Sequence, residues 1–591
     1  MTFRSVGVAA LLLLLAGCAA SPTVTVPPRP HGILLIVPEA DTTAAGFSQY
    51  RLSGSTSPGS TLTLNGAPLR VYPTGAFGGL LPVKTGENVY TLEAVAASGA
   101  RASRTFVINR PEGPTSTPAD TLVIENARME PAADLLLRAG DQLRVQCKGT
   151  PGMKATFLDG IPMREMPPSE AGGFSGIYRG IYTAKATDTA QGMRVTFRLE
   201  DTSGRSVTAR SRGRVSFLPG GTPMVGVVKG ERPYLNHGLG EDRLGGAKFS
   251  FLPAGVRLAL DGKWGDQYRV RLTEVQEAWI PEALVDVQPA GTFLPSSLTG
   301  NITLSGDTSF DYVALTLSDK LPFSTWQEED PARVHVDVYG AMANTNWITH
   351  LGSAREVSAV SYTQPAAGTF RLTLSLRHSQ VWGYEVTYRG NTLVVKVRRQ
   401  PADLDLGRLT IAVDAGHGGS NQGALGSTGA KEKDVNLAMA RHLKTELERR
   451  GARVFMTRDG EEAGGNTERL RAVVAANADL LVSIHSNSTG LTSNPLDAQG
   501  IGTFYKHICY RPLAVAVLEE VLKTGLRNGG TVGNFNFTLN SATELPSVLV
   551  ETAFMSHPED EMKLLDDGFR KEMAVRIADG LERFLEGCEE E

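Results

Sequence analysis

Four side chains in the last third of the chain stand beside segments that an α/β sheet would bring together, and they constrain the fold more than any other feature. His417, His485 and Glu551 each come directly after a short apolar segment, and Glu432 stands just before a segment with helical periodicity. Sites in open α/β sheets form at the carboxyl ends of the strands. The sequence therefore predicts that these four residues meet at one edge of a sheet.

The residue types at these positions indicate a metal site. Two histidines and a glutamate, here His417, Glu432 and His485, are a common ligand set for a catalytic zinc ion, Zn2+, which keeps one coordination position for water. A further glutamate beside that water, Glu551, can move protons. A lone histidine after a strand is usually a structural residue, but two histidines and two glutamates at element edges favour a site. The predicted reaction class is metal-assisted hydrolysis.

The region around these residues, 405–588, has the pattern of an α/β domain. From Leu409 onward, apolar strand-like segments alternate with amphipathic helical segments. The expected strands are 410–413, 453–456, 480–484 and 547–550, and the expected helices are 434–450, 467–478, 513–526 and, as one or two helices, 559–585. These elements predict a central twisted sheet flanked by helices.

Two units near the start of the chain show the short alternating strands and turns of β-sandwiches. Residues 32–111 include the hairpin signal Asn65-Gly66 and resemble small immunoglobulin-like modules of bacterial surface proteins. Residues 119–217 repeat the pattern more loosely, with clean alternation at 194–199, and suggest a second sandwich. The fold class predicted for this half of the chain is therefore all-β.

Two further all-β units are expected before the α/β domain. Residues 222–288 resemble bacterial Src-homology-3-like barrels, which often bind cell-wall peptides, and a plain spacer barrel is the equal alternative. Residues 294–400 alternate at 333–338 and 390–397. This last unit resembles the AMIN domain, a β-sandwich that commonly precedes amidase domains and targets them to the wall.

Six segments of the α/β region form a characteristic series. They are 414–419 (Asp-Ala-Gly-His-Gly-Gly), 432–437, 457–458, 475–478, 483–487 and 546–554. In this order they resemble the zinc-dependent N-acetylmuramoyl-L-alanine amidases. The resemblance implies zinc ligands at His417, Glu432 and His485 and a catalytic glutamate at Glu551. It also implies peptidoglycan as the substrate, with hydrolysis of the amide between N-acetylmuramic acid and the L-alanine of the stem peptide.

The N-terminus carries a pattern typical of exported lipoproteins. Its apolar run is too short to span a bilayer and has the length of a signal-peptide core. The run ends in Leu15-Ala16-Gly17-Cys18, which resembles the lipobox of bacterial lipoproteins. The resemblance implies removal of residues 1–17, a membrane-attached lipid on Cys18 and a linker over 18–31. The predicted location is the cell envelope, at the periplasmic face, and Ala19 favours the outer membrane if the source has two membranes.

Composition limits the other partners. The 591-residue chain has a formal net charge of −4 and no long basic stretch, so no nucleic-acid partner is expected. Cys147, Cys509 and Cys588 are too few and too far apart for a disulfide framework, although a single pair stays open. Division or envelope proteins are candidate partners for the β modules.

Other functions remain open at this point. Ligand chemistry alone also suits a zinc peptidase that cuts within the stem peptide, and the large β region suits a non-enzymatic wall-binding lipoprotein. Some members of the resembling family place a regulatory helix over the site, between the second histidine and the last glutamate. Here only 66 positions separate His485 from Glu551. We therefore expect no large plug, and we expect the isolated catalytic domain to cut without an activator.

Overall fold

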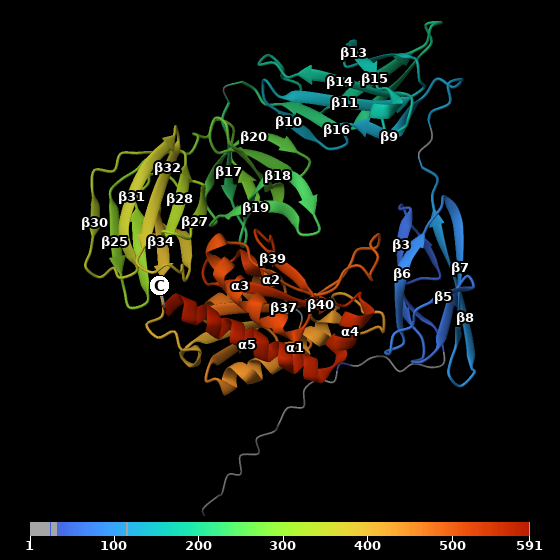
Figure 1. Ribbon diagram of the computed structural model, residues 1–591. Coiled ribbons are helices and arrows are strands. Elements are labelled where there is room, and N and C mark those ends of the chain that lie inside the picture. The colour runs from blue at the N-terminus through green and yellow to red at the C-terminus, as the bar shows by residue number, and fades with distance from the viewer. Residues whose placement is uncertain (1–23, 25–31, 114–115, 221, 463, 590–591) are drawn as a thin grey trace, which may run out of the picture.

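The structure is a computed structural model, and it describes residues 24, 32–113, 116–220, 222–462 and 464–589. The predicted signal peptide and nearly all of the predicted linker lie outside these residues. A large all-β region comes first in the chain, and an α/β domain follows it (Figure 1). This order confirms the predicted succession of an all-β region and an α/β domain, and the module types predicted for the β units stay predictions. In the described part of the chain, no helix combines the length and the apolar character that crossing a membrane requires.

The first β unit is a two-sheet sandwich with its own closed core. One sheet has the order β1-β3-β6 and the other β2-β8-β7-β4-β5. Leu52, Leu92 and Phe106 are fully buried between them. Asn65 and Gly66 have positive φ angles and form the two-residue turn between β4 and β5, as predicted. The strands are β1 Leu34–Val37, β2 Thr42–Ala44, β3 Gln49–Ser55, β4 Thr61–Leu64, β5 Ala67–Leu69, β6 Ala76–Pro82, β7 Gly86–Val95 and β8 Arg101–Arg110.

The second and third β units are joined through one continuous sheet. Strand β10 pairs with β16 of the second unit and with β20 of the third. At this seam, Arg269 donates to Asp141 at 2.7 Å and to Asp261 at 2.8 Å. The strands are β9 Ile124–Glu130, β10 Leu135–Leu137, β11 Gln142–Gly149, β12 Lys154–Phe157, β13 Ile161–Glu165, β14 Ile177–Thr183, β15 Met193–Glu200, β16 Ser206–Phe217, β17 Met224–Val228, β18 Tyr234–Asp242, β19 Gly245–Phe251, β20 Arg257–Trp264, β21 Gln267–Arg271, β22 Glu277–Pro281 and β23 Val285–Val287.

The fourth β unit packs its main sheets, β30-β25-β26-β34-β33 and β27-β28-β32-β31, around a core that it shares with its neighbours. One apolar cluster contains Leu258 of the third unit, Leu315 of the fourth and Tyr510 of the α/β domain. The strands are β24 Ser297–Leu298, β25 Ile302–Gly306, β26 Phe310–Leu315, β27 Phe323–Glu328, β28 Arg333–Tyr339, β29 Ala341–Met342, β30 Ile348–His350, β31 Val357–Ala366, β32 Thr369–Leu376, β33 Tyr384–Arg389 and β34 Thr392–Arg398. The alternating stretch 390–397 lies mostly in β34, but Gly390 and Asn391 at its start form the turn between β33 and β34.

The α/β domain has a six-stranded mixed sheet of order β36-β35-β37-β40-β38-β39. Strands β36, β35, β37 and β40 are parallel to one another, and β38 runs antiparallel to β40. Helices cover the sheet, and α5 packs against both α1 and α3 (Figure 1). The elements are β35 Thr410–Ala415, α1 Glu432–Arg449, β36 Arg453–Met456, α2 Asn466–Ala475, β37 Leu480–Asn487, β38 Ile501–Phe504, α3 Arg511–Val521, β39 Asn528–Val532, β40 Ser547–Phe554, α4 Pro558–Leu565 and α5 Asp567–Glu589.

Three of the predicted site residues lie inside elements rather than after or before them. His485 and Glu551 pair with each other in the register of β37 and β40, since both strands continue for two or more residues past their apolar stretches. Glu432 is the first residue of α1. His417 follows β35 in a loop, as expected.

Candidate metal centre

The turn after β35 brings His417 to the sheet edge through unusual backbone geometry. His417 has a φ of 64°, in the left-handed region that L side chains seldom adopt. A side chain at Gly416 would collide with the ring of His485, so only glycine fits there. Strained residues of this kind cost about 1–3 kcal/mol and persist where the surroundings fix them. The turn is therefore held in place by its neighbours.

Two buried arginines hold this turn by its backbone carbonyls. Arg469 donates to the carbonyl oxygens of Ala415 at 2.8 Å and His417 at 2.5 Å. Arg458 donates to the oxygens of Ala415 at 2.8 Å and Gly416 at 3.1 Å. The charge of Arg469 is balanced by a buried ion pair of 3.0 Å with Asp414. Sequence reasoning gave none of these residues a role, because a carbonyl-holding arginine has no spacing signature.

His417, Glu432 and His485 converge at one point. Their nearest ligand atoms all lie within 4.8 Å of one another. Oε1 of Glu432 lies 3.1 Å from Nε2 of His417 and 3.2 Å from Nδ1 of His485. Burial would raise the pKa of the Glu432 carboxyl, but hydrogen bonds from the two histidines hold this pKa well below its usual value. Glu432 is therefore a carboxylate that faces two imidazoles.

Glu551 stands beside this cluster, opposite His485 in the register of β37 and β40. It is 9 % exposed, and burial raises its pKa to about 7, against the lowering effect of the His485 charge. Nε2 of His485 and Oε2 of Glu551 are buried, and neither has a hydrogen-bond partner among the described residues. Buried polar atoms are normally paired. A cation with a bound water at this place would satisfy both atoms, so the residues present fit a metal centre of the kind predicted.

Aromatic side chains border the cluster at His485. The ring of Phe537 meets that of His485 edge to face, with centroids 5.4 Å apart, and Phe535 packs against Phe537. Both lie in the segment between His485 and Glu551 where a plug was considered. Helix α3, predicted in the same segment, instead packs against α5 and β38 and buries seven of its residues. Phe537 was not identified from the sequence, because an aromatic residue in a loop carries no signal of its own.

Other histidines of this domain have structural partners. The ring of His557 accepts backbone hydrogen bonds at the start of α4, and His442 contacts Asp567 at 2.9 Å. Burial lowers the pKa of His507 to about 3, so this ring is neutral beside the carbonyl of Ser541. These contacts agree with a structural role for His442, His507 and His557 rather than a role as metal ligands.

Comparison with known proteins decides the family. Residues 411–583 match the sequence model of the N-acetylmuramoyl-L-alanine amidases. The chain belongs to the N-acetylmuramoyl-L-alanine amidase family. It is 28 % identical over 368 residues to the N-acetylmuramoyl-L-alanine amidase AmiC of Neisseria meningitidis, a match that covers 47 % of this chain and 88 % of AmiC. It is 34 % identical over 197 residues to the amidase LytC of Bacillus subtilis, and this match covers 32 % of this chain and 38 % of LytC.

Among solved structures, the amidase AmiC2 of Nostoc punctiforme is 32 % identical over 30 % of this chain and 98 % of that chain, with a TM-score of 0.29. The likeness to AmiC of Neisseria meningitidis covers more of this chain than its α/β domain occupies. Because only two residues follow that domain, the similarity to this amidase must extend upstream into the β region.

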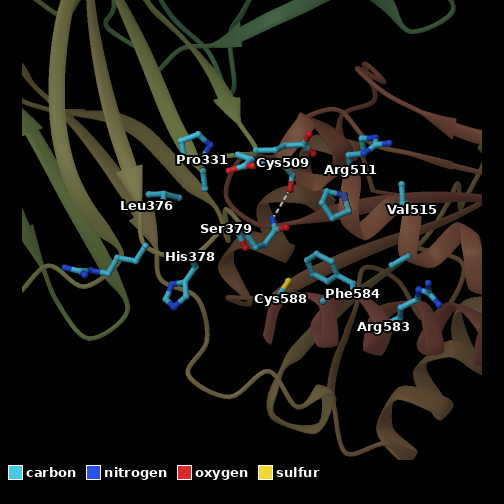
Figure 2. Close-up of a pocket in the computed structure, with 18 of the residues that line it drawn as sticks. Pro331, Leu376, His378, Ser379, Cys509, Arg511, Val515, Arg583, Phe584 and Cys588 are labelled. Atoms are coloured by element: carbon cyan, nitrogen blue, oxygen red, sulfur yellow. Dashed lines mark hydrogen bonds between the residues drawn. The ribbon is translucent and has the colours of Figure 1, made fainter. Parts of the chain in front are cut away.

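A cavity elsewhere in the molecule is separate from the candidate metal centre. It has a volume of about 790 Å³ and lies between the fourth β unit and helices α3 and α5 (Figure 2). Its lining includes His378, Cys509 and Arg511 and none of the four candidate site residues. Burial raises the pKa of the Cys509 thiol well above its usual value, so this thiol is inert. This cavity, despite its size, is therefore not part of the candidate metal centre.

Proposed function

We propose that this chain is a zinc-dependent peptidoglycan hydrolase that cuts the amide between N-acetylmuramic acid and the L-alanine of the stem peptide. The observation that carries the proposal is the convergence of His417, Glu432 and His485 within 4.8 Å, with the buried Glu551 beside them. The family match and the relatives that bear the amidase name support the same activity.

His417, Glu432 and His485 would hold the zinc ion. When bound, zinc lowers the pKa of a water molecule towards ~7 and polarises the carbonyl that the water attacks. Glu551 is the proton carrier in this proposal. Its carboxylate takes the proton of the attacking water and returns it to the nitrogen of the leaving L-alanine. A pKa of about 7, raised by burial, suits a group that must both accept and donate at neutral pH.

The β region would place this chemistry at the wall. We infer that a lipid on Cys18 anchors the chain in the envelope and that the β units, immunoglobulin-like, Src-homology-3-like and AMIN-like, bind the wall or other envelope proteins. Wall binding raises the local substrate concentration, as a tethered second site does. The cellular role would be wall remodelling or the separation of daughter cells.

One digestion experiment separates this function from its alternatives. Purified peptidoglycan is incubated with the full chain and zinc, and the products are identified by mass spectrometry. Intact stem peptides with free L-alanine amino termini are the expected result. Cuts inside the peptide would instead identify a zinc peptidase. No products, with the protein still pelleting on peptidoglycan, would identify a wall-binding protein without activity.

The anchor is tested separately. Cys18→Ser is expected to move the chain from the membrane fraction to the soluble fraction and to leave hydrolysis of soluble substrates unchanged. The site and the predicted lipid lie at opposite ends of the sequence. A wild-type chain that is already soluble would contradict the lipoprotein inference.

A further inference from the structure

A cavity of about 400 Å³ lies where the third β unit meets the α/β domain. One wall comes from the hairpin of β18 and β19, with Arg243 at its tip and Lys248 on β19. The opposite wall comes from Phe537 and from Asn466, the first residue of α2. The cavity is thus made jointly by two units that are far apart in sequence.

The cavity adjoins the candidate metal centre. Phe537 lines the cavity, and its ring also meets the ring of His485, with the two centroids 5.4 Å apart. The positive charge of Arg243, in the turn of the hairpin, acts in the direction that lowers the pKa of the Glu551 carboxyl. Phe537 is thus shared by the cavity and the surroundings of the metal centre, although none of the four candidate site residues lines the cavity.

The hairpin is fixed to the α/β domain. Nδ2 of Asn536 donates to the backbone oxygen of Gly246 at 2.6 Å. Nζ of Lys506 donates to the backbone oxygen of Lys248 at 2.9 Å and to Oδ1 of Asn536 at 2.8 Å. These bonds hold the cavity in its present shape.

The cavity is strongly cationic. Arg232, Arg243 and Lys248 line it, and Glu231, the one carboxylate among its described lining residues, is in an ion pair with Arg471. From outside the lining, Glu544 acts on Arg232, and Glu241 and Asp242 act on Lys248. Arg232 is anchored because it donates to the carbonyl oxygen of Ser541 at 3.0 Å and stacks at 4.3 Å over the ring of Phe251. Arg243 is exposed and makes no ion pair with any described residue. The ten-residue helix α2 also points its positive N-terminal end here.

Positive charge at this density is costly unless an anion shares the space. Burial, together with the charges of Lys248 and Arg232, lowers the pKa of the neighbouring Lys506 to about 8. Arginine is the side chain best suited to grip a carboxylate, because its planar fork donates two parallel hydrogen bonds. The cavity is thus built for a carboxylate.

We propose that this cavity is a subsite for a carboxylate of the peptide half of the substrate, with Arg243 as the specificity-determining contact. The inference rests on the proposed function. In the amide to be cut, the lactyl carboxyl of the sugar is consumed in the bond itself and the N-acetyl groups are neutral. The peptide keeps free carboxylates, so the anionic half of the substrate is the leaving peptide. The hairpin of a β unit would then select the peptide.

The test compares soluble muropeptides whose peptide carboxylates are free or amidated. The full-length chain is used with zinc. The wild type is expected to show a KM about tenfold lower for the free acid, with a similar kcat for both. Arg243→Ala is expected to raise the KM for the acid to that of the amide, and Arg243→Lys to restore part of the preference. Arg271→Ala removes an exposed arginine of the same β unit that does not line the cavity, and it should change nothing.

Binding of the released peptide provides a readout without turnover. By calorimetry, the free-acid peptide should bind the wild type about tenfold more tightly than its amide, and Arg243→Ala should abolish this difference. Cleavage of both muropeptides with no preference that depends on Arg243 would overturn the subsite and leave the proposed function intact. Binding that depends on Arg243 without any cleavage would overturn the proposed function instead. A peptide-free muramoyl sugar that shows the same dependence on Arg243 would reassign the subsite to the sugar.

Discussion

The candidate functional residues of the α/β domain lie together at one place, whereas the β region shows no such concentration among its described residues. In the α/β domain, the four candidate site residues gather at one sheet edge, and one of them, His417, lies on a strained turn held by two arginines. In the β region, the described residues contain no comparable group of potential metal ligands, and the units are joined by shared sheets and apolar cores. A single substitution in the cluster of the α/β domain should therefore abolish activity. Substitutions in the β region should instead lower stability, or the positioning of the enzyme at the wall, by degrees.

The largest effect is expected from loss of a ligand. His485→Ala should abolish both zinc binding and hydrolysis, because the remaining two groups cannot complete the ligand set, and stringent chelation of the wild type should do the same. Bound zinc is measured by elemental mass spectrometry beside muropeptide turnover. His378→Ala serves as the matched control, since His378 lines the separate cavity of Figure 2. Full turnover in zinc-free protein would refute the metal centre.

The next effect separates chemistry from metal binding. Glu551→Gln keeps the shape of the side chain but removes its ability to accept a proton. We expect zinc content and thermal stability to stay near wild type while kcat falls ~10²–10⁴-fold, the usual worth of general acid–base catalysis. If this variant instead loses its zinc, Glu551 is a ligand and Glu432 needs a different role.

Sequence reasoning succeeded where the signal is local. His485 and Glu551 follow apolar strands, and Glu432 begins a periodic helix, so the α/β fold and the four residues of the cluster could be proposed from neighbours in the sequence. The cluster itself supports that proposal, although the ligand roles stay predictions. The strands run further than expected because β37 and β40 continue pairing beyond their apolar residues.

The joints between units could not be predicted, for a physical reason. Whether β10 pairs with β20, or the charge of Arg243 acts on Glu551, depends on residues about 125 or 300 positions apart. No periodicity or turn residue encodes such a contact. The four β units were therefore expected as separate modules, whereas three of them share a sheet or a core with a neighbour. Their family names remain predictions.

Trp382 tests how strongly the fourth β unit stabilises the α/β domain. This side chain belongs to the fourth β unit but is 1 % exposed within the core of the α/β domain, with its ring centroid 6.1 Å from that of Phe584 on α5. Trp382→Ala should destabilise α5 by about 3 kcal/mol, since large-to-small core changes of this kind cost about 3–5 kcal/mol. Hydrogen exchange of α5 amides would then accelerate ~100-fold.

The control for this change is Trp347→Ala, because Trp347 is 61 % exposed in the same β unit and should leave α5 unaffected. Unchanged exchange in the Trp382 variant would mean that the two units fold independently. The result also decides how the catalytic domain should be isolated. A fragment that begins near Leu404 loses Trp382 from its core, so the predicted activity of the isolated domain is better tested on a chain that begins at the third β unit.

The smallest effect is expected from the first β unit, which has a closed core of its own. Its contacts with the α/β domain include several polar ones: Arg51 donates to the carbonyl oxygen of Thr489 and to Ser488, and Ser53 contacts Ser427 at 2.8 Å. The backbone N–H of Arg51 donates to the oxygen of Leu491 at 2.7 Å, and Arg70 forms an exposed ion pair with Glu559 at 3.1 Å. Each such bond contributes about 0.5–1.5 kcal/mol. Deletion of residues 32–113 should therefore leave the rest folded, keep turnover of soluble muropeptides within about twofold, and slow digestion of intact sacculi several-fold through lost tethering.

Arg51→Ala distinguishes tethering from control of the site. If the first unit only places the enzyme, this variant loosens its docking but retains wall binding, so sacculi and soluble muropeptides should both be cut at nearly the wild-type rate. If instead the unit restrains the loop after β37, which contains Ser488 and Thr489, both the deletion and Arg51→Ala should speed the cleavage of soluble substrate. That outcome would contradict the contrast drawn above, because a β unit with a separate core would then govern the chemistry directly. Parallel rate measurements on the two substrates decide between these roles.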